Sequence, residues 1–264
     1  MTKIAIIAGG GKLPLLIGKN LQDKNYDIFY IILNDFVNTN DYKNNNFIKL
    51  PITSFKDILN QLKKHKIDKI IMAGSIKRPA ISDMKFDFTT LNLIKNYFLE
   101  SKGDDQLLNS VSNFFLKKGY SLFNWVDECK DLFESKDLIT NSTPSHSAYQ
   151  NLKKGLSVFK IVGKADIGQS LVIQNKLILG IESIEGTDEL LKRCYKYKKK
   201  GDLGVILKLS KYNQNIYLDL PTIGVKTFQN MKLYNYEGIF IEKNKCIIID
   251  KEKVVEFCNE NNIF

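Results

Sequence analysis

The stretch KIAIIAGGGKLPLLIG, residues 3–18, decides the fold because it joins two apolar segments through three consecutive glycines. Residues 3–8 predict a buried strand, and residues 14–21 predict the helix that follows it. Pro14 fits the first turn of that helix, where its missing N–H costs nothing. A glycine turn in this position either brings backbone N–H groups close to a phosphate or only makes a tight turn.

The glycine turn carries only part of the dinucleotide-binding fingerprint G-x-G-x-x-G. Gly9 and Gly11 match the first two glycines, but Pro14 occupies the place of the third. Asp35 is also a poor match to the acid that contacts the ribose of NAD. An NAD(P)-dependent oxidoreductase that uses this domain is therefore the alternative hypothesis and not the first one.

Strands and helices alternate through the first half of the chain. Residues 28–33 and 67–73 predict strands, and a helix is expected between them, from an N-cap at Ser54 to His65. Two more helices are predicted at 88–100 and 104–118. This alternation predicts an α/β fold in which a doubly wound parallel sheet forms a Rossmann-like N-terminal domain.

The segment ESKDLITNSTPSH, residues 134–146, is rich in Ser, Thr, Asn and Asp, and it predicts a linker. It divides the chain into an N-terminal domain at 1–133 and a second, catalytic α/β domain at 147–264. In the second domain we expect helices at 147–161, 187–196 and 251–261, and strands at 170–174 and 177–181.

The composition is that of a globular protein with an excess of positive charge. The chain has 264 residues, of which 39 are basic and 29 acidic, giving a formal charge of +10. Such an excess suits nucleic acid, an anionic membrane surface or a phosphorylated substrate, but scattered lysines can also reflect composition alone. No nucleic-acid-binding motif is present, and the basic residues are not interleaved with aromatic ones in one stripe. Nucleic acid is therefore not an expected partner.

The cysteines, histidines and apolar segments argue against several further classes of site and of protein. None of the four cysteines forms a C-x-x-C pair, and the two histidines show no metal-ligand spacing, which argues against zinc, redox and Ser-His-Asp sites. Free thiols in a reducing compartment are expected. The apolar run at residues 4–8 is too short for a secretory signal, and no window reaches the roughly 18 apolar residues of a membrane span. We therefore expect a cytoplasmic protein that lies peripherally on the inner face of the cytoplasmic membrane.

Two polar segments of the first domain are candidate site segments. AGSIKRP, residues 73–79, follows the third strand, where Gly74 and Ser75 either face the binding crevice of an open parallel sheet or begin a solvated basic loop. KGDDQLL, residues 102–108, places Asp104 at a helix start, where it either caps the helix or binds a divalent metal.

The second domain contributes two further segments before its central strands and helix. DIGQS, residues 166–170, precedes a predicted strand. In ESIEGTDELLKR, residues 182–193, Thr187 is a good helix cap and Asp188 suits the first helical turn. Taken alone, each of these segments is explained by a structural role without a functional one.

The last two segments offer charged groups. LKLSK, residues 207–211, presents Lys208 and Lys211 either as a phosphate clamp or as an exposed pair. DLPTIG, residues 219–224, puts Asp219 directly before a stiff Leu-Pro turn at a strand end. An acid held in this way suits a catalytic or metal-binding role.

The order of these motifs resembles the UDP-2,3-diacylglucosamine pyrophosphatases of lipid A synthesis, specifically the two-domain LpxI family: IAGGGKLP, AGSIKRP, KGDDQLL, DIGQS, IEGTDELLKR, KLSK and DLPTIG. The likeness runs from about residue 3 to the C-terminus. It implies a Rossmann-like N-terminal domain and hydrolysis of UDP-2,3-diacylglucosamine, a lipid-linked nucleotide, to UMP and 2,3-diacylglucosamine 1-phosphate. It also implies a divalent metal, Mg²⁺ or Mn²⁺, and attack of water on the β-phosphorus.

The resemblance also implies site residues. The family's catalytic aspartate lies in its D-x-P-x-x-G element, which here is Asp219. The expected metal ligands are Asp219, Asp188 and Asp104. Tyr212 and Tyr217 depart from the pattern, because proline and arginine are common at these positions in the family. With the resemblance, the candidate substrate-binding residues are Gly10, Gly11, Gly74, Ser75, Lys102, Gln169, Thr187, Lys208, Lys211 and Thr222.

Overall fold

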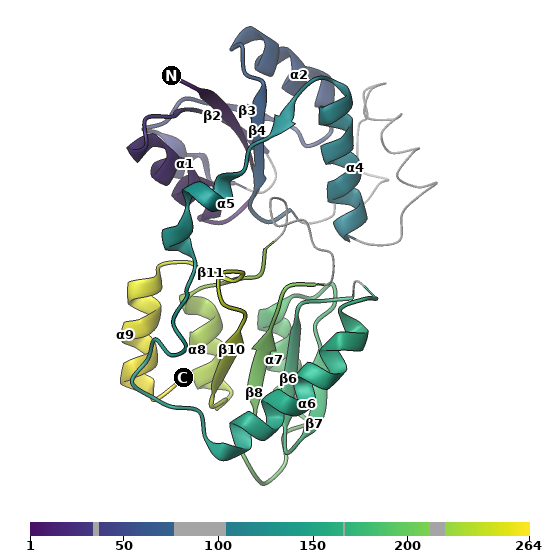
Figure 1. Cartoon of the computed structure of the whole chain (residues 1–264), viewed down its shortest axis with the longest axis vertical. Coiled ribbons are helices and arrows are strands. Elements are labelled where there is room, and N and C mark those ends of the chain that lie inside the picture. The colour runs from purple at the N-terminus through teal and green to yellow at the C-terminus, as the bar shows by residue number, and fades with distance from the viewer. Residues whose placement is uncertain (34–36, 77–103, 166, 212–219) are drawn as a thin grey trace. The chain divides into compact units, whose positions relative to one another are not determined.

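The computed structural model of the chain describes residues 1–33, 37–76, 104–165, 167–211 and 220–264 (Figure 1). The chain divides into two compact units between Cys129 and Lys130, each with its own sheet. The helix predicted at 88–100 lies outside the described residues. None of the helices within these ranges has the length and apolar character that crossing a bilayer requires.

The first unit is built on a five-stranded parallel sheet with the order β3-β2-β1-β4-β5. Its strand β1 is the apolar segment before the glycine turn, and it pairs with β2 on one side and β4 on the other. The strand order reverses at β1, so the loops after β1 and β4 emerge at the carboxyl edge where open sheets bind ligands. The strands are β1 (Lys3–Ala8), β2 (Asp27–Leu33), β3 (Phe47–Leu50), β4 (Lys69–Ala73) and β5 (Ser121–Leu122).

Helices cover both faces of this sheet. Phe55 of α2 and Phe115 of α4 join the strand residue Ile7 in one buried cluster. On the other face, Gly18 of α1 approaches Tyr30 so closely that its Cβ would clash with the tyrosine hydroxyl. The expected α/β domain with a parallel sheet is confirmed. The helices are α1 (Leu13–Asp23), α2 (Phe55–Lys64), α4 (Asp104–Lys117), α5 (Trp125–Glu128) and the 3-10 helix η1 (Thr39–Tyr42).

The second unit has a four-stranded mixed sheet with the order β10-β8-β6-β7. β6 and β7 form an antiparallel hairpin whose turn residues, Asn175 and Lys176, have the positive φ angles of 51° and 62° that a type I′ turn requires. β6 is also antiparallel to β8, whereas β8 and β10 are parallel, so β8 and β10 end where β6 begins. The strands are β6 (Ser170–Gln174), β7 (Leu177–Ile181), β8 (Val205–Lys208) and β10 (Gly238–Ile241), with β9 (Thr222–Ile223) and β11 (Ile247–Ile248) in a separate parallel pair.

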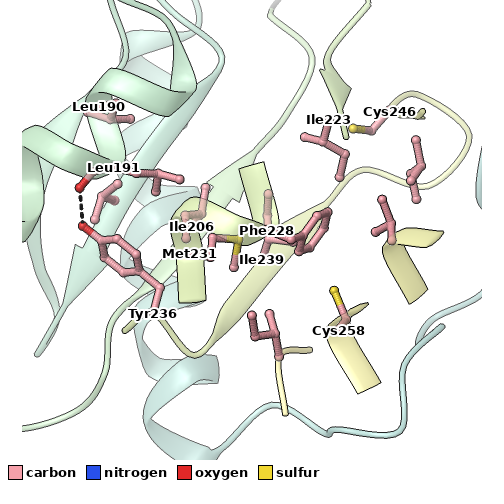
Figure 2. Packing of buried hydrophobic residues seen from close by; sticks show 14 of the residues in the cluster. Leu190, Leu191, Ile206, Ile223, Phe228, Met231, Tyr236, Ile239, Cys246 and Cys258 are labelled. Atoms are coloured by element: carbon pink, nitrogen blue, oxygen red, sulfur yellow. Dashed lines mark hydrogen bonds between the residues drawn. The ribbon is translucent and has the colours of Figure 1, made fainter. Parts of the chain in front are cut away.

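Helices α7, α8 and α9 pack on one face of this sheet over a buried apolar cluster (Figure 2). Met231 of α8 belongs to this cluster, and the buried hydroxyl of Tyr236 donates to the carbonyl oxygen of Leu191 at 2.9 Å. Helix α6 packs on the other face through Ala148 and Phe159. The helices are α6 (His146–Val162), α7 (Thr187–Tyr195), α8 (Val225–Leu233), α9 (Lys251–Asn261) and the 3-10 helix η3 (Lys130–Leu132).

The four cysteines are all buried, and none of them forms a disulfide. Cys246 and Cys258 lie in the apolar cluster of the second unit (Figure 2). Burial raises the pKa of Cys194 to about 11 and the pKa values of Cys246 and Cys258 to about 12. The thiols are therefore part of the core, in agreement with the expectation of free thiols.

Residues 134–146, the predicted linker, run along the surface of the second unit. The backbone N–H of Asn141 donates to the side chain of Asn259 at 2.7 Å. Near the end of the segment, the carboxylate of Glu237 accepts hydrogen bonds from both the N–H and the hydroxyl of Ser145. The segment is thus held by this unit, and the predicted domain boundaries stay a prediction.

Gly168 marks a close approach between two segments of the second unit. A Cβ at this position would lie 2.0 Å from the carbonyl oxygen of Glu182. The N–H of Glu182 donates to the carbonyl of Ser170 at 2.8 Å, which holds the two segments together. Since the obstacle is backbone and not a flexible side chain, a residue larger than glycine would force the segments apart.

We expect Gly168→Ala to destabilise the protein by about 3 kcal/mol, because the new methyl group must displace a backbone carbonyl. Gly224→Ala is the matched control in the same unit, since the nearest atom to its Cβ would lie 3.6 Å away, an ordinary contact. Its expected cost is about 1 kcal/mol or less. Differential scanning calorimetry of the full chain measures both shifts. Equal shifts would contradict the steric role of Gly168.

Candidate functional site

At the carboxyl edge of the first sheet, the loops after β1 and β4 are joined by backbone hydrogen bonds. The N–H of Gly10 donates to the carbonyl of Ser75 at 2.7 Å, and the N–H of Ser75 donates back to Gly10 at 2.9 Å. The N–H of Gly9 donates to Ala73 at 2.8 Å. The structure therefore brings the predicted residues Gly10, Gly74 and Ser75 together.

Glycine is needed on both sides of this contact. A Cβ on Gly9 would lie 2.6 Å from the carbonyl oxygen of Ser75, and one on Gly74, where φ is +94°, would lie 2.7 Å from that of Gly10. These glycines bring one loop against the other, and the N–H of Gly10 is already donated to Ser75. Gly11 has a φ of +86°, is exposed, and has open space around its Cβ position just before α1. Phosphate binding by these residues stays a prediction.

The second candidate region surrounds the ammonium group of Lys208 at the end of β8. Lys208 is only 4% exposed, so the interpretation of LKLSK as an exposed pair is wrong for this residue. Its Nζ donates to the hydroxyls of Thr187 at 2.8 Å and Ser170 at 3.1 Å. It also lies 3.5 Å from the carboxylate of Glu182. Two predicted residues, Thr187 and Lys208, are thus in direct contact.

Glu182 completes this cluster, and sequence reasoning missed it. It follows β7, is 8% exposed, and its Oε1 accepts from the hydroxyl of Thr187 at 2.7 Å. Its buried Oε2 faces Lys208 and makes no hydrogen bond within the described part of the chain. Burial raises the pKa of Glu182, but the charge of Lys208 and hydrogen bonds to the carboxylate outweigh burial and bring the pKa below its usual value. The sequence feature that could have identified Glu182 is its position directly after an apolar strand.

Thr187 does not cap α7 as predicted. Gly186, with a φ of +79°, occupies the N-cap position, and Thr187 is the first helical residue. A cap residue needs non-helical backbone angles, which glycine adopts without steric cost, so the Thr187 hydroxyl bonds instead with Glu182 and Lys208. The start of α7 therefore lies directly beside the buried ammonium group, and the N–H groups of a helix start favour an anion.

Asp188, a predicted metal ligand, lies in the first turn of α7 and contacts the first turn of α8. Its carboxylate accepts from the hydroxyl of Thr227 at 3.2 Å and lies 3.4 Å from Nζ of Lys226. These contacts bring the starts of two helices together and occupy the carboxylate with a hydroxyl and a cation. Over the described ranges, no three His, Cys, Asp or Glu residues are grouped so that they could hold a metal ion.

Three other predicted residues lie in or next to the strands of the second unit. The carbonyl of Gln169 accepts from the N–H of Leu209 at 2.9 Å, which places Gln169 beside the end of β8. Lys211 is half-buried shortly after that strand. The hydroxyl of Thr222 donates to the carbonyl of Leu220 at 3.0 Å, a local contact after the proline turn. The structure thus joins Gln169 to the Lys208 region, whereas among the described residues Thr222 has no such link.

The predicted catalytic residue Asp219 lies outside the described residues, as do Lys102 and the two departures from the family pattern, Tyr212 and Tyr217. Asp104 begins α4, where a helix start was predicted, but its side chain is not in the described part of the chain. Of the three predicted metal ligands, only Asp188 is therefore placed.

Comparison with known families covers both units. The family model described as the LpxI N-terminal domain matches residues 3–132, and the one described as the LpxI C-terminal domain matches residues 135–264. The chain belongs to the LpxI family. A curated relative, the UDP-2,3-diacylglucosamine pyrophosphatase LpxI of Caulobacter vibrioides (strain ATCC 19089 / CIP 103742 / CB 15), is 27% identical over 271 residues. That alignment covers 100% of this chain and 96% of the relative.

Solved structures add little to the LpxI assignment. The Bordetella bronchiseptica enzyme WbmH in complex with NAD⁺ is 15% identical with a TM-score of 0.28, covering 43% of this chain and 36% of that one. A short chain dehydrogenase family protein from Francisella tularensis subsp. tularensis SCHU S4 is 21% identical with a TM-score of 0.27, covering 62% of each chain. Similarity at this level carries no argument about fold or cofactor.

We expect Glu182→Gln to destabilise the protein by about 3–5 kcal/mol, because the ammonium group of Lys208 then stays buried without a counter-charge. The double variant Glu182→Gln/Lys208→Met should recover most of this loss, since it removes both charges. Glu189→Gln is the matched control, because Glu189 pairs with Lys192 at 3.6 Å on the exposed surface and should change stability by less than about 1 kcal/mol. Denaturant unfolding of the four proteins measures the differences.

The difference in unfolding free energy between wild type and Glu182→Gln should depend on pH. Because the pKa of Glu182 is lowered on folding, its stabilisation is fully present above the unfolded value of about 4.3 and is lost as the pH falls through the folded value. The difference between wild type and Glu182→Gln should therefore be largest at neutral pH and shrink on acidification. A difference that is absent at neutral pH would contradict the stabilising role of the pair.

Proposed function

We propose that the protein hydrolyses UDP-2,3-diacylglucosamine to UMP and 2,3-diacylglucosamine 1-phosphate in lipid A biosynthesis. The observation that carries this proposal is the match of both LpxI domain models, at residues 3–132 and 135–264. The Caulobacter relative is a UDP-2,3-diacylglucosamine pyrophosphatase by name, which supports hydrolase activity and suggests the substrate. An NAD(P)-dependent oxidoreductase is not favoured, because both matched domains are LpxI domains and the glycine turn has Pro14 in place of the third glycine.

In the proposed reaction, the oxygen of a water molecule forms a bond to the β-phosphorus while the bond from this phosphorus to the bridging oxygen breaks. The bridging oxygen leaves with UMP, and the water oxygen stays on the sugar phosphate. Negative charge grows on the bridging oxygen, so positively polarised groups are needed around the pyrophosphate. The start of α7, with Lys208 at 2.8 Å from the Thr187 hydroxyl, supports a pyrophosphate position at this edge of the second sheet.

In this proposal, the buried Lys208 does not contact the phosphate directly. Its ammonium group already donates hydrogen bonds to Thr187 and Ser170 and forms an ion pair with Glu182. Because Glu182 balances the charge of Lys208, we assign Lys208 to positioning the start of α7. Lys211, which is half-buried after the same strand, stays a proposed direct phosphate contact of this unit, and Gly11 stays a separate proposal for the first unit.

We further propose that Asp219 is the catalytic residue and that Mg²⁺ or Mn²⁺ is the cofactor. A divalent ion supplies charge neutralisation at the pyrophosphate oxygens. The D-x-P-x-x-G element supports Asp219 for both roles, with Asp104 as a second ligand. Asp188 is the weakest candidate ligand, because Thr227 and Lys226 already contact its carboxylate. Its part in the proposal is to join the starts of α7 and α8.

The products and their isotope content test the reaction. In ¹⁸O-labelled water, we expect UMP without label and 2,3-diacylglucosamine 1-phosphate with one labelled oxygen, both read by mass spectrometry. EDTA should abolish turnover, and added Mg²⁺ or Mn²⁺ should restore it. Absence of UMP under every condition would refute the proposed function, whereas full activity in EDTA would refute only the metal role.

Substitutions of Asp219 test its catalytic role. We expect Asp219→Ala and Asp219→Asn to lower single-turnover UMP release by at least about 10²-fold, because both remove the negative charge while the fold and lipid affinity persist. Asp137→Ala is the matched control, since this aspartate is 91% exposed and pairs only with Lys243 among the described residues. Circular dichroism verifies folding. A folded Asp219→Ala protein within tenfold of the wild-type rate would move catalysis to another residue.

A further inference from the structure

One surface of the second unit is unusually basic and aromatic. Residues 192–200, KRCYKYKKK, contain six lysines or arginines and two tyrosines, which is an exception to the expectation that basic and aromatic residues are not interleaved. In the structure these residues form the end of α7 and the turn after it. We call this segment, together with Leu233 and Tyr234 at the end of α8, the basic patch. Helices α7 and α8 pack against each other.

The charge of the basic patch is largely uncompensated. Lys192 pairs with Glu189 at 3.6 Å, and Arg193 pairs with Glu185 at 2.6 Å. Lys196, Lys199 and Lys200 are exposed, and none of them forms an ion pair with any residue that the structure describes. Within the described ranges, the charges of these three lysines therefore have no acidic partner.

The backbone that carries these lysines is held in place. The side chain of Gln174 donates to the carbonyl of Lys199 at 2.9 Å and accepts from its N–H at 2.8 Å. The side chain of Asn175 donates to the carbonyl of Lys200 at 3.1 Å. These contacts use only backbone groups of the lysines, so the fold of the turn does not require lysine side chains here.

Lys198 differs from its neighbours because its side chain ties α7 to α8. Its Nζ donates to the carbonyl of Tyr234 at 3.0 Å and lies 4.4 Å from the ring centre of Tyr236. Burial lowers the pKa of Lys198 to about 8. The rings of Tyr195 and Tyr234 lie 5.4 Å apart, so the two helix ends present one continuous surface.

Apolar groups are exposed within the same surface. Leu233 is 68% exposed, Tyr197 is 58% exposed and Tyr195 is 51% exposed. Lysines with exposed tyrosine and leucine side chains match the interface of an anionic bilayer, where ammonium groups meet phosphates and amphipathic rings reach the headgroup region. Single-stranded nucleic acid would use lysines and rings but gains nothing from stacking on an aliphatic Leu233.

We propose that the basic patch is the surface through which the protein binds an anionic lipid bilayer. This inference deepens the proposed function and rests on it in one respect, namely that a substrate with two acyl chains is supplied from a membrane. The patch lies at the end of α7 opposite to Thr187, so binding and the proposed chemistry use different residues of the same helix.

The test is co-sedimentation of the full chain with phosphatidylcholine vesicles that contain or lack phosphatidylglycerol. We expect binding only to the anionic vesicles, weakened by salt because exposed charges are screened. Each lysine near an anionic surface contributes about a fivefold increase in binding, so Lys196→Glu/Lys199→Glu/Lys200→Glu should weaken it by about 100-fold or more.

A matched triple variant separates the basic patch from net charge. Lys153, Lys154 and Lys160 are exposed on α6, and Lys153→Glu/Lys154→Glu/Lys160→Glu changes the net charge by the same amount. We expect this variant to keep vesicle binding within about fivefold of wild type, the worth of a single lysine. Leu233→Ser should weaken the binding that persists in high salt, because it removes an exposed apolar contact.

Three results would overturn the proposal: no binding of the wild type to anionic vesicles, equal losses in the two triple variants, or full displacement of vesicles by single-stranded DNA with the same dependence on the basic patch. An activity assay with substrate dispersed in detergent micelles tests the proposed hydrolase function independently of vesicle binding. The patch variant should retain wild-type turnover there. Inactivity of the wild type in micelles would refute the hydrolase proposal while leaving the vesicle result to decide the membrane surface.

Discussion

The buried ion pair between Lys208 and Glu182 is the interaction on which the second unit's polar edge depends. It lies where β8 ends, β7 ends, β6 begins and α7 begins, so one ammonium group contacts the first residues of β6 and α7 and the residue after β7. Charges in a protein interior are stable only when paired and hydrogen-bonded. The need to pair this lysine therefore fixes the relative positions of four chain segments.

Much of the fold could be predicted from the sequence because its elements have clear periodic patterns and boundaries. The hairpin strands β6 and β7 and the helix α9 have the predicted bounds. The strands β3 and β5 were missed because they are short edge strands, and one of them has only two residues. Their pairing is decided by the neighbouring strand and not by their own composition. Ser54 was placed correctly before α2, but its side chain makes no capping hydrogen bond.

The candidate site was predictable in residue types but not in its contacts. The resemblance identified Lys208 and Thr187, yet nothing in the sequence shows that these side chains meet each other or that Glu182 is their partner. A buried charge pair forms between residues distant in sequence, here 26 positions apart (208 − 182). Likewise, the opening glycines predicted a close approach, and the structure shows one to the Ser75 loop, whereas phosphate binding stays a prediction.

The burial of all four thiols has a consequence for the reactivity of the protein. A thiolate is the nucleophile in alkylation and oxidation, and a raised pKa keeps Cys194, Cys246 and Cys258 in the thiol form at neutral pH. Their low exposure also keeps reagents away from the sulfur atoms. A cysteine introduced at any exposed position would thus react far faster than the native four. Either unit can therefore carry a spectroscopic label without removal of the native cysteines.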